Sequence, residues 1–265
     1  MMRTITLSAV LLFLAATVPA LADDVVLTLE ERHGDDIEEI RMMVSEGRLA
    51  SMNEDDEVTM IFVRESGSLI TIDHDERAYL ELNRDNVSVM VDEIDRAMQE
   101  MRAQLDQMPP QQREMIEQQM GAMFGETAEA PPERTFSETD ERGSAAGIDC
   151  RWYDILEEDR TIGRACVAAH TDVPGGEDML AMMSAMGEFY EELLSQMAGR
   201  VPMILPANPI LPLTDLSGLP IRSFEQRDDE EEAIETELLR IERTAVDPGH
   251  FEVPRGYRAM EMGMR

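Results

Sequence analysis

The chain has 265 residues, and its 56 acidic against 23 basic side chains give a formal net charge of −33. A chain of this length can bury a substantial hydrophobic core as one large domain or two small ones. Every basic residue is Arg, and the acidic excess argues against nucleic acid or anionic lipid headgroups as partners, because both select clusters of Lys and Arg. The acidity fits either a salty medium or the solubility of an exported protein.

The first 22 residues have the pattern of an export signal. A basic start at Met1–Arg3 precedes an apolar run from Leu7 to Val18 and the small-x-small site Ala20–Ala22, so cleavage is expected between Ala22 and Asp23. The apolar run is too short to cross about 30 Å of hydrocarbon, and no Cys lies near the site to carry a lipid anchor. The sequence therefore predicts a soluble periplasmic protein comprising residues 23–265, with no transmembrane segment.

Residues 25–82 have the pattern of an antiparallel meander. Apolar residues recur at period two in short runs, and polar turns such as Glu46-Gly47 and Ser66-Gly67-Ser68 separate the runs. The expected strands include a run from Val25, then Ile40–Val44, Arg48–Met52, Val58–Val63, Leu69–Ile72 and Ala78–Leu82.

The apolar period then changes to three and four, which is typical of helices. One stripe ends at Pro109-Pro110 and comprises Val87, Met90, Ile94, Met98, Met101, Leu105 and Met108. A shorter helix is predicted over Gln111–Phe124. A third helix is predicted over Glu177–Ala198, with Met183, Met186 and Phe189 on its apolar face.

The remaining segments predict linkers and further strands. Residues 125–143 are expected to form a mobile linker, and four prolines make 201–213 an extended segment. Strands resume at Ile148, and the last ones are expected at Leu219–Gln226 and Ala233–Thr244. The order of strands and helices predicts a single α+β domain over residues 23–265, with Met-rich helices packed on one face of an antiparallel sheet.

Cys150 and Cys166 are the only cysteines, and the predicted compartment is oxidising. A hairpin turning around Glu157–Asp159 would place the two cysteines directly opposite each other, close enough for a disulfide. The alternative is a redox or metal-binding thiol pair, but their separation is not a C-x-x-C spacing and no His lies in the hairpin. We therefore predict a structural bridge.

Several short motifs together resemble a numbered bacterial family of exported proteins of unknown function. They are Leu69–Asp73 with Arg77–Leu82, Gly147–Asp154 with Gly163–Ala168, Gly218–Arg222 and Phe251–Tyr257. Such proteins are similar in outline to periplasmic lipoprotein carriers. That resemblance implies a strongly curved, half-barrel-like antiparallel sheet with helices against its concave face, and it implies no particular activity.

Methionine is the strongest anomaly of composition, with 22 residues. Helical spacing favours ordinary core packing, but flexible thioethers also suit an adaptable surface for a lipid chain or an amphipathic partner. On that second interpretation the ligand-facing residues are Met90, Met98, Met101, Met183, Met186 and Phe189. A third interpretation is Cu(I) binding, for which Met260, Met262 and Met264 have a usable spacing.

No enzymatic motif occurs in the sequence. The four histidines are scattered, and no P-loop, dinucleotide or nucleophile-elbow pattern is present. The leading hypothesis is a non-enzymatic periplasmic protein without a cofactor that binds a lipophilic ligand or an envelope protein. The alternatives are a structural or interaction protein with a solid core, and a periplasmic copper-binding protein.

Overall fold

The computed structural model describes residues 24–106, 134–157, 160–197, 216, 218–226 and 233–260. The predicted cleavage site at Ala22 and Asp23, the short helix over 111–124 and the Pro-rich segment 201–213 lie outside these residues.

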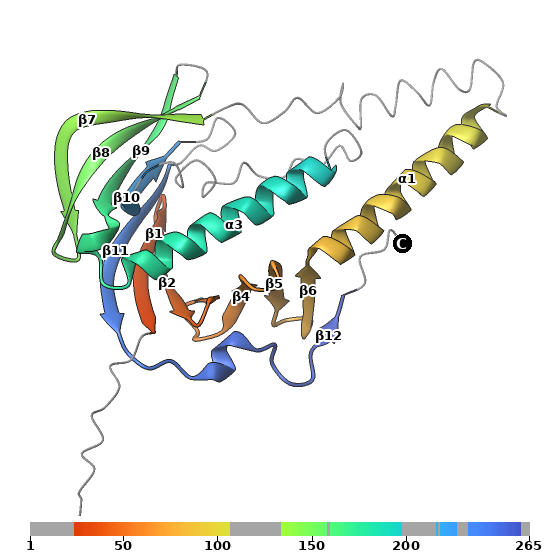
Figure 1. The fold of residues 1–265 in the computed structure, drawn as a ribbon, viewed down its shortest axis with the longest axis horizontal. Coiled ribbons are helices and arrows are strands. Elements are labelled where there is room, and N and C mark those ends of the chain that lie inside the picture. Colours follow the sequence, from red (N-terminus) through yellow and green to blue (C-terminus); the bar gives the residue numbers. More distant parts are fainter. Residues whose placement is uncertain are drawn as a thin grey trace, which may run out of the picture.

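Most of the described chain belongs to one curved, unclosed sheet (Figure 1). The elements are β1 (Val25–His33), β2 (Asp36–Ser45), β3 (Arg48–Met52), β4 (Val58–Val63), β5 (Ser68–Asp73), β6 (Ala78–Leu82), α1 (Arg84–Asp106), β7 (Arg134–Ala145), β8 (Ile148–Glu157), β9 (Arg160–Ala169), α3 (Gly176–Met197), β10 (Gly218–Glu225), β11 (Ile234–Arg243) and β12 (Arg258–Ala259), with 3₁₀ turns at His170–Asp172 and Pro248–Phe251. The expected meander over residues 25–82 and the third helix are confirmed.

The sheet consists of two meanders that meet at its centre. Its strand order is β12-β6-β5-β4-β3-β2-β1-β11-β10-β9-β8-β7. All neighbours are antiparallel except β12 and β6, which are parallel. Because β1 pairs with β11, the chain passes from β6 near one edge to β7 at the opposite edge before it returns to the centre.

Two hairpins have the two-residue turns that their sequences specify. Glu46 and Gly47 join β2 to β3 with φ values of 48° and 74°, and Ala146 and Gly147 join β7 to β8 with 52° and 77°. Positive φ at both central residues matches the twist of the flanking strands, and glycine adopts it without strain. The turn expected at Glu46-Gly47 is thus confirmed.

The expectation of a linker over 125–143 is wrong for residues 134–143, which lie in β7. β7 is an edge strand whose side chains are mostly exposed, and among its residues Ala145 is buried and Phe136 packs on a buried cluster. An edge strand needs few apolar residues, so the alternating signal that reveals the other strands is absent here.

The main core joins α3 to the sheet. α3 contributes Met179, Met182, Met183, Met186, Phe189 and Leu193 to one buried cluster, in which strand residues such as Val25, Leu49 and Leu238 and the α1 residues Val87 and Val91 also pack. Met182 and Met186 are among the most deeply buried side chains, at 1% and 2% exposure. The methionine stripe of α3 therefore serves core packing.

The other face of the sheet has apolar clusters of its own. Met42 packs against the main cluster while its neighbour Met43 belongs to a second cluster, and successive residues of a strand point to opposite faces. Residues 244–260, here called the C-terminal strap, cover this second cluster with Phe251, Val246 and Tyr257. The Arg48 guanidinium lies 4.9 Å from the centre of the Phe251 ring. The sequence pattern did not predict the strap.

Candidate functional site

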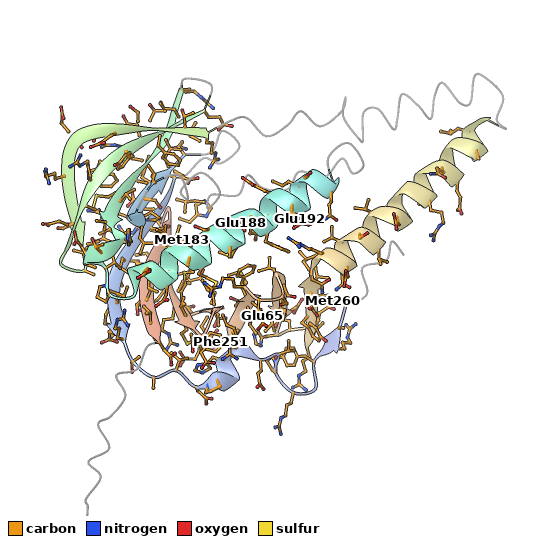
Figure 2. The ribbon with its side chains drawn as sticks, viewed as in Figure 1. Glu65, Met183, Glu188, Glu192, Phe251 and Met260 are labelled. Carbon is orange, nitrogen blue, oxygen red and sulfur yellow. A yellow bond between two sulfur atoms is a disulfide. The ribbon has the colours of Figure 1, made fainter. Side chains whose placement is uncertain are left out.

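A cleft of about 400 Å³ opens between α3, the turn that follows β4 and the start of α1. Its lining consists of Phe62, Arg64, Glu65, Ser66, Gly67, Arg84, Ala181, Ser184, Ala185, Glu188, Phe189 and Glu192. Figure 2 shows Glu188 and Glu192 on α3 and Glu65 below that helix. The volume lies within the roughly 300–1,000 Å³ that is typical of small-molecule sites.

The α3 wall of the cleft follows from helical geometry. Ala181, Ser184, Ala185, Glu188 and Glu192 recur at spacings of three and four, so they share one side of the helix. Alanine and serine at the first three positions leave space between the helix and the β4–β5 turn that larger side chains would fill. The adjoining side of α3 carries the buried methionines.

Aromatic rings line the inner end of the cleft. The ring centroids of Phe62 and Phe189 are 5.9 Å apart with an interplanar angle of 56°, and Phe189 makes an edge contact with Tyr190 at 5.7 Å. Tilted pairs of this kind are favourable beyond the area they bury. Both Phe62 and Phe189 are buried in the main core and also line the cleft, so the apolar lining rests on a fixed support.

Charged side chains surround the cleft. Arg84 Nε donates to Glu192 Oε2 at 2.6 Å, which joins the start of α1 to α3. The Arg64 guanidinium lies beside Gly47, and the Arg64 backbone N–H donates to the Gly47 carbonyl. Within the described residues, the exposed carboxylates of Glu65 and Glu188 have no ion-pair or hydrogen-bond partner.

The residues predicted to face a ligand have different locations. Met183 and Met186 are buried in the main core, whereas Phe189 lines the cleft. Met90, Met98 and Met101 belong to α1, and their side chains lie outside the described part of the structure.

The predicted copper-binding tail is described only in part. The Met260 backbone N–H donates to the Tyr79 carbonyl at 2.8 Å, while Met262 and Met264 lie outside the described residues. Across the described segments, no group of three His, Cys, Asp or Glu side chains could hold a metal ion. The same segments contain no helix that is long and apolar enough to cross a membrane.

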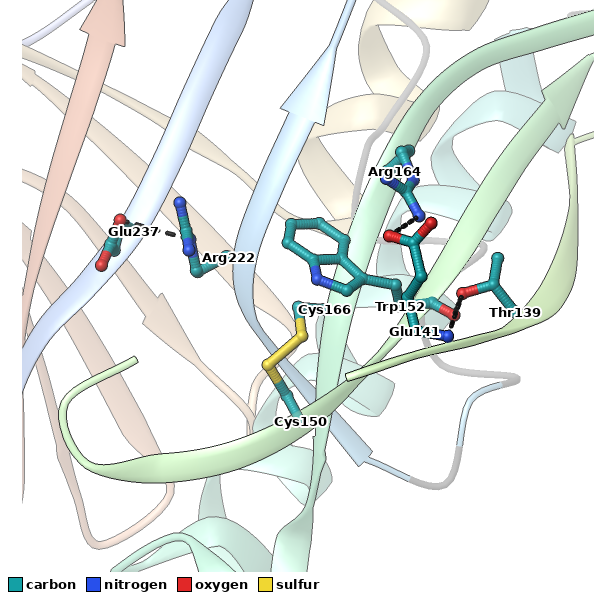
Figure 3. Close-up of a disulfide and its surroundings, with 8 residues drawn as sticks. All are labelled: Thr139, Glu141, Cys150, Trp152, Arg164, Cys166, Arg222 and Glu237. Carbon is teal, nitrogen blue, oxygen red and sulfur yellow. Dashed lines mark hydrogen bonds and ion pairs between the residues drawn. A yellow bond between two sulfur atoms is a disulfide. The ribbon is translucent and has the colours of Figure 1, made fainter. Parts of the chain in front are cut away.

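The predicted disulfide between Cys150 and Cys166 is present, with its Cα atoms 5.4 Å apart (Figure 3). The expected register is wrong, because Cys166 faces Trp152 and not Cys150. In the expected register Glu157 would face Asp159, but it pairs with Arg160, which is a slip of one residue. A bulge between Ile155 and Leu156 adds a second residue to the slip. The resulting slip of two residues keeps both cysteines on the same face, and the bridge therefore still forms.

The disulfide lies in a densely packed polar and aromatic environment. Arg164 and Arg222 lie 5.1 and 5.8 Å from the Trp152 ring centre, and carboxylates of Glu141 and Glu237 bind them at 2.8 and 3.2 Å. Gly143 allows this packing, since a Cβ there would lie 2.9 Å from both Cys166 Sγ and Trp152 Nε1. These contacts explain the packing of Trp152, Arg164 and Arg222 beside the disulfide without a bound ligand.

A second cleft of about 410 Å³ lies beneath the C-terminal strap. His74 Nε2 donates to the Val58 carbonyl at 2.7 Å, and His74 Nδ1 lies 2.8 Å from the Tyr257 hydroxyl. A carbonyl can only accept, so in the neutral imidazole Nδ1 accepts from Tyr257. His74 thus holds the C-terminal strap against the sheet. Both of its ring nitrogens have protein partners, so no bound ligand is needed to explain a histidine at this position.

Glu31 has a perturbed pKa. Burial raises the pKa of Glu31, and the carboxylate of Glu38, which faces it across β1 and β2, raises it further, while His33 lowers it. The ionised form of Glu31 is therefore disfavoured in the fold.

Comparison with known proteins adds little to this description. No protein-family model and no curated protein matches the chain. An uncharacterized conserved protein from Thermus thermophilus aligns over 91% of this chain and 91% of its own, with 4% identity and a TM-score of 0.43. PNGF-II aligns over 89% of this chain and 30% of its own, with 11% identity and a TM-score of 0.36. Both TM-scores are below 0.5, so neither likeness carries an argument, and the family resemblance stays a prediction.

Proposed function

We propose that the mature chain is a non-enzymatic, soluble periplasmic protein that binds a lipophilic ligand in the cleft between α3 and the β4–β5 turn. The export signal supports the compartment, and the disulfide is compatible with it. In this proposal the helices close one face of the curved sheet, as in the half-barrel carriers that the sequence resembles.

The observation that carries the proposal is the aromatic lining of the cleft. An apolar group that enters the cleft would lie against Phe62, Phe189 and Ala185 and lose its contact with water. The methionines behind this wall have unbranched side chains that fill irregular gaps in the core, and their packing holds α3 in place beside the cleft. Seven of the twelve residues that line the cleft are polar or charged, so the cleft offers contacts for a polar head group beside the apolar ones.

A fluorescence titration with the apolar dye N-phenyl-1-naphthylamine tests the proposal. The Ala185→Phe variant fills the cleft, so it should weaken dye binding by at least about tenfold. Ser195→Phe places the same side chain at an exposed position of α3 outside the cleft lining and should bind as the wild type does. Absence of dye binding, or equal loss in both variants, would contradict the proposal and favour an interaction protein with a solid core.

A further inference from the structure

We infer that the ligand is a cationic amphiphile, whose apolar tail lies on Phe62 and Phe189 and whose positive head group lies between Glu65 and Glu188. This inference rests on the proposed binding function and adds the charge class of the ligand. It follows from which charges at the cleft are already paired.

Of the two cations that line the cleft, one is paired with a carboxylate. Arg84 is bound to Glu192 at 2.6 Å, whereas the Arg64 guanidinium lies beside Gly47 and has no ion-pair partner among the described residues. The two remaining carboxylates belong to opposite walls, Glu65 to the β4–β5 turn and Glu188 to α3, and neither has a partner in the described part of the chain. The unpaired charges of the cleft are therefore two carboxylates and one guanidinium, and this excess of negative charge favours a cation.

The rest of the molecule favours the same sign of charge. The formal net charge of −33 attracts cations toward any opening and repels anionic amphiphiles. The apolar lining and the two unpartnered carboxylates therefore fit the two ends of one cationic amphiphile.

Displacement of bound N-phenyl-1-naphthylamine by three compounds with the same decyl tail tests the charge class. The compounds are decyltrimethylammonium, decyl maltoside and decyl sulfate. Two exposed ion pairs predict that the cation displaces the dye at about tenfold lower concentration than the anion does, and that added salt reduces this preference.

Two variants with equal changes of net charge locate the effect. Glu65→Gln/Glu188→Gln should lose the preference for the cation and still bind decyl maltoside as the wild type does. Glu177→Gln/Glu191→Gln, at exposed α3 positions outside the cleft lining, should keep the preference. Equal displacement by all three compounds in the wild type, or equal loss of preference in both variants, would overturn this inference alone. Failure of the dye and all three compounds to bind would overturn the proposed function as well.

Discussion

Reduction of the Cys150–Cys166 disulfide should lower the free energy of unfolding by about 3 kcal/mol. The bridge closes a loop with a sequence separation of 16, and the chain-entropy relation for a loop of that length gives about 3 kcal/mol at 25 °C. For a chain of this size, that loss corresponds to a fall in Tm of about 6–12 °C. Both sulfur atoms remain after reduction, so the comparison measures the cross-link without a change of core volume.

Urea unfolding followed by tryptophan fluorescence measures this difference. Trp152 is the sole tryptophan and faces Cys166, so its emission reports on the hairpin that the bridge joins. The urea dependence should also steepen on reduction, because the unfolded chain becomes more expanded. The Cys150→Ala/Cys166→Ala variant should not respond to the reductant. A difference below about 1 kcal/mol between oxidised and reduced wild type would refute the reasoning from loop closure.

Three further changes test the packing and the electrostatics of the fold. Met186→Ala removes a side chain that is 2% exposed and should cost about 2–5 kcal/mol in urea unfolding, whereas a cost below about 1 kcal/mol would show that α3 does not form the core. Gly175→Ala should destabilise by about 1–3 kcal/mol, because φ is +70° there and a Cβ would overlap Val25; an unchanged thermal midpoint would contradict that geometry. The raised pKa of Glu31 means that its stabilising contribution is complete below its ordinary pKa of 4.5 and is lost as pH rises through the raised value. Glu31→Gln should therefore raise the urea midpoint at pH 7 and leave it unchanged at pH 4. Glu39→Gln, at an exposed position of the same hairpin, should leave the midpoint unchanged at both pH values; equal effects of both variants would contradict a local cause.

The sequence predicted those parts of the fold in which side-chain periodicity reflects burial. The run Ala78–Leu82 became β6 with the same bounds, and the helix expected over 177–198 became α3 over Gly176–Met197. Each has a face in the core, and that requirement leaves a period in the sequence. β7 was missed because an edge strand with exposed side chains leaves no such period.

Features that depend on pairing across the sheet could not be read from one sequence. The bulge beyond Ile155 moved the register of β8 and β9 by an amount that the turn residues did not reveal. The cleft combines the β4–β5 turn, α1 and α3, which are distant in sequence. Phe189 was named because it lies on the apolar stripe, whereas Glu65 and Glu188 are two of 56 acidic residues and gave no separate signal.

Native mass spectrometry of the protein, released from periplasm without detergent, tests the ligand-binding proposal most directly. The account predicts a species heavier than the disulfide-bonded chain by the mass of a small amphiphile. That species should be absent from the Ala185→Phe variant and present in the Ser195→Phe variant. A single mass equal to that of the chain alone, in a protein that also takes up no apolar dye, would contradict the account.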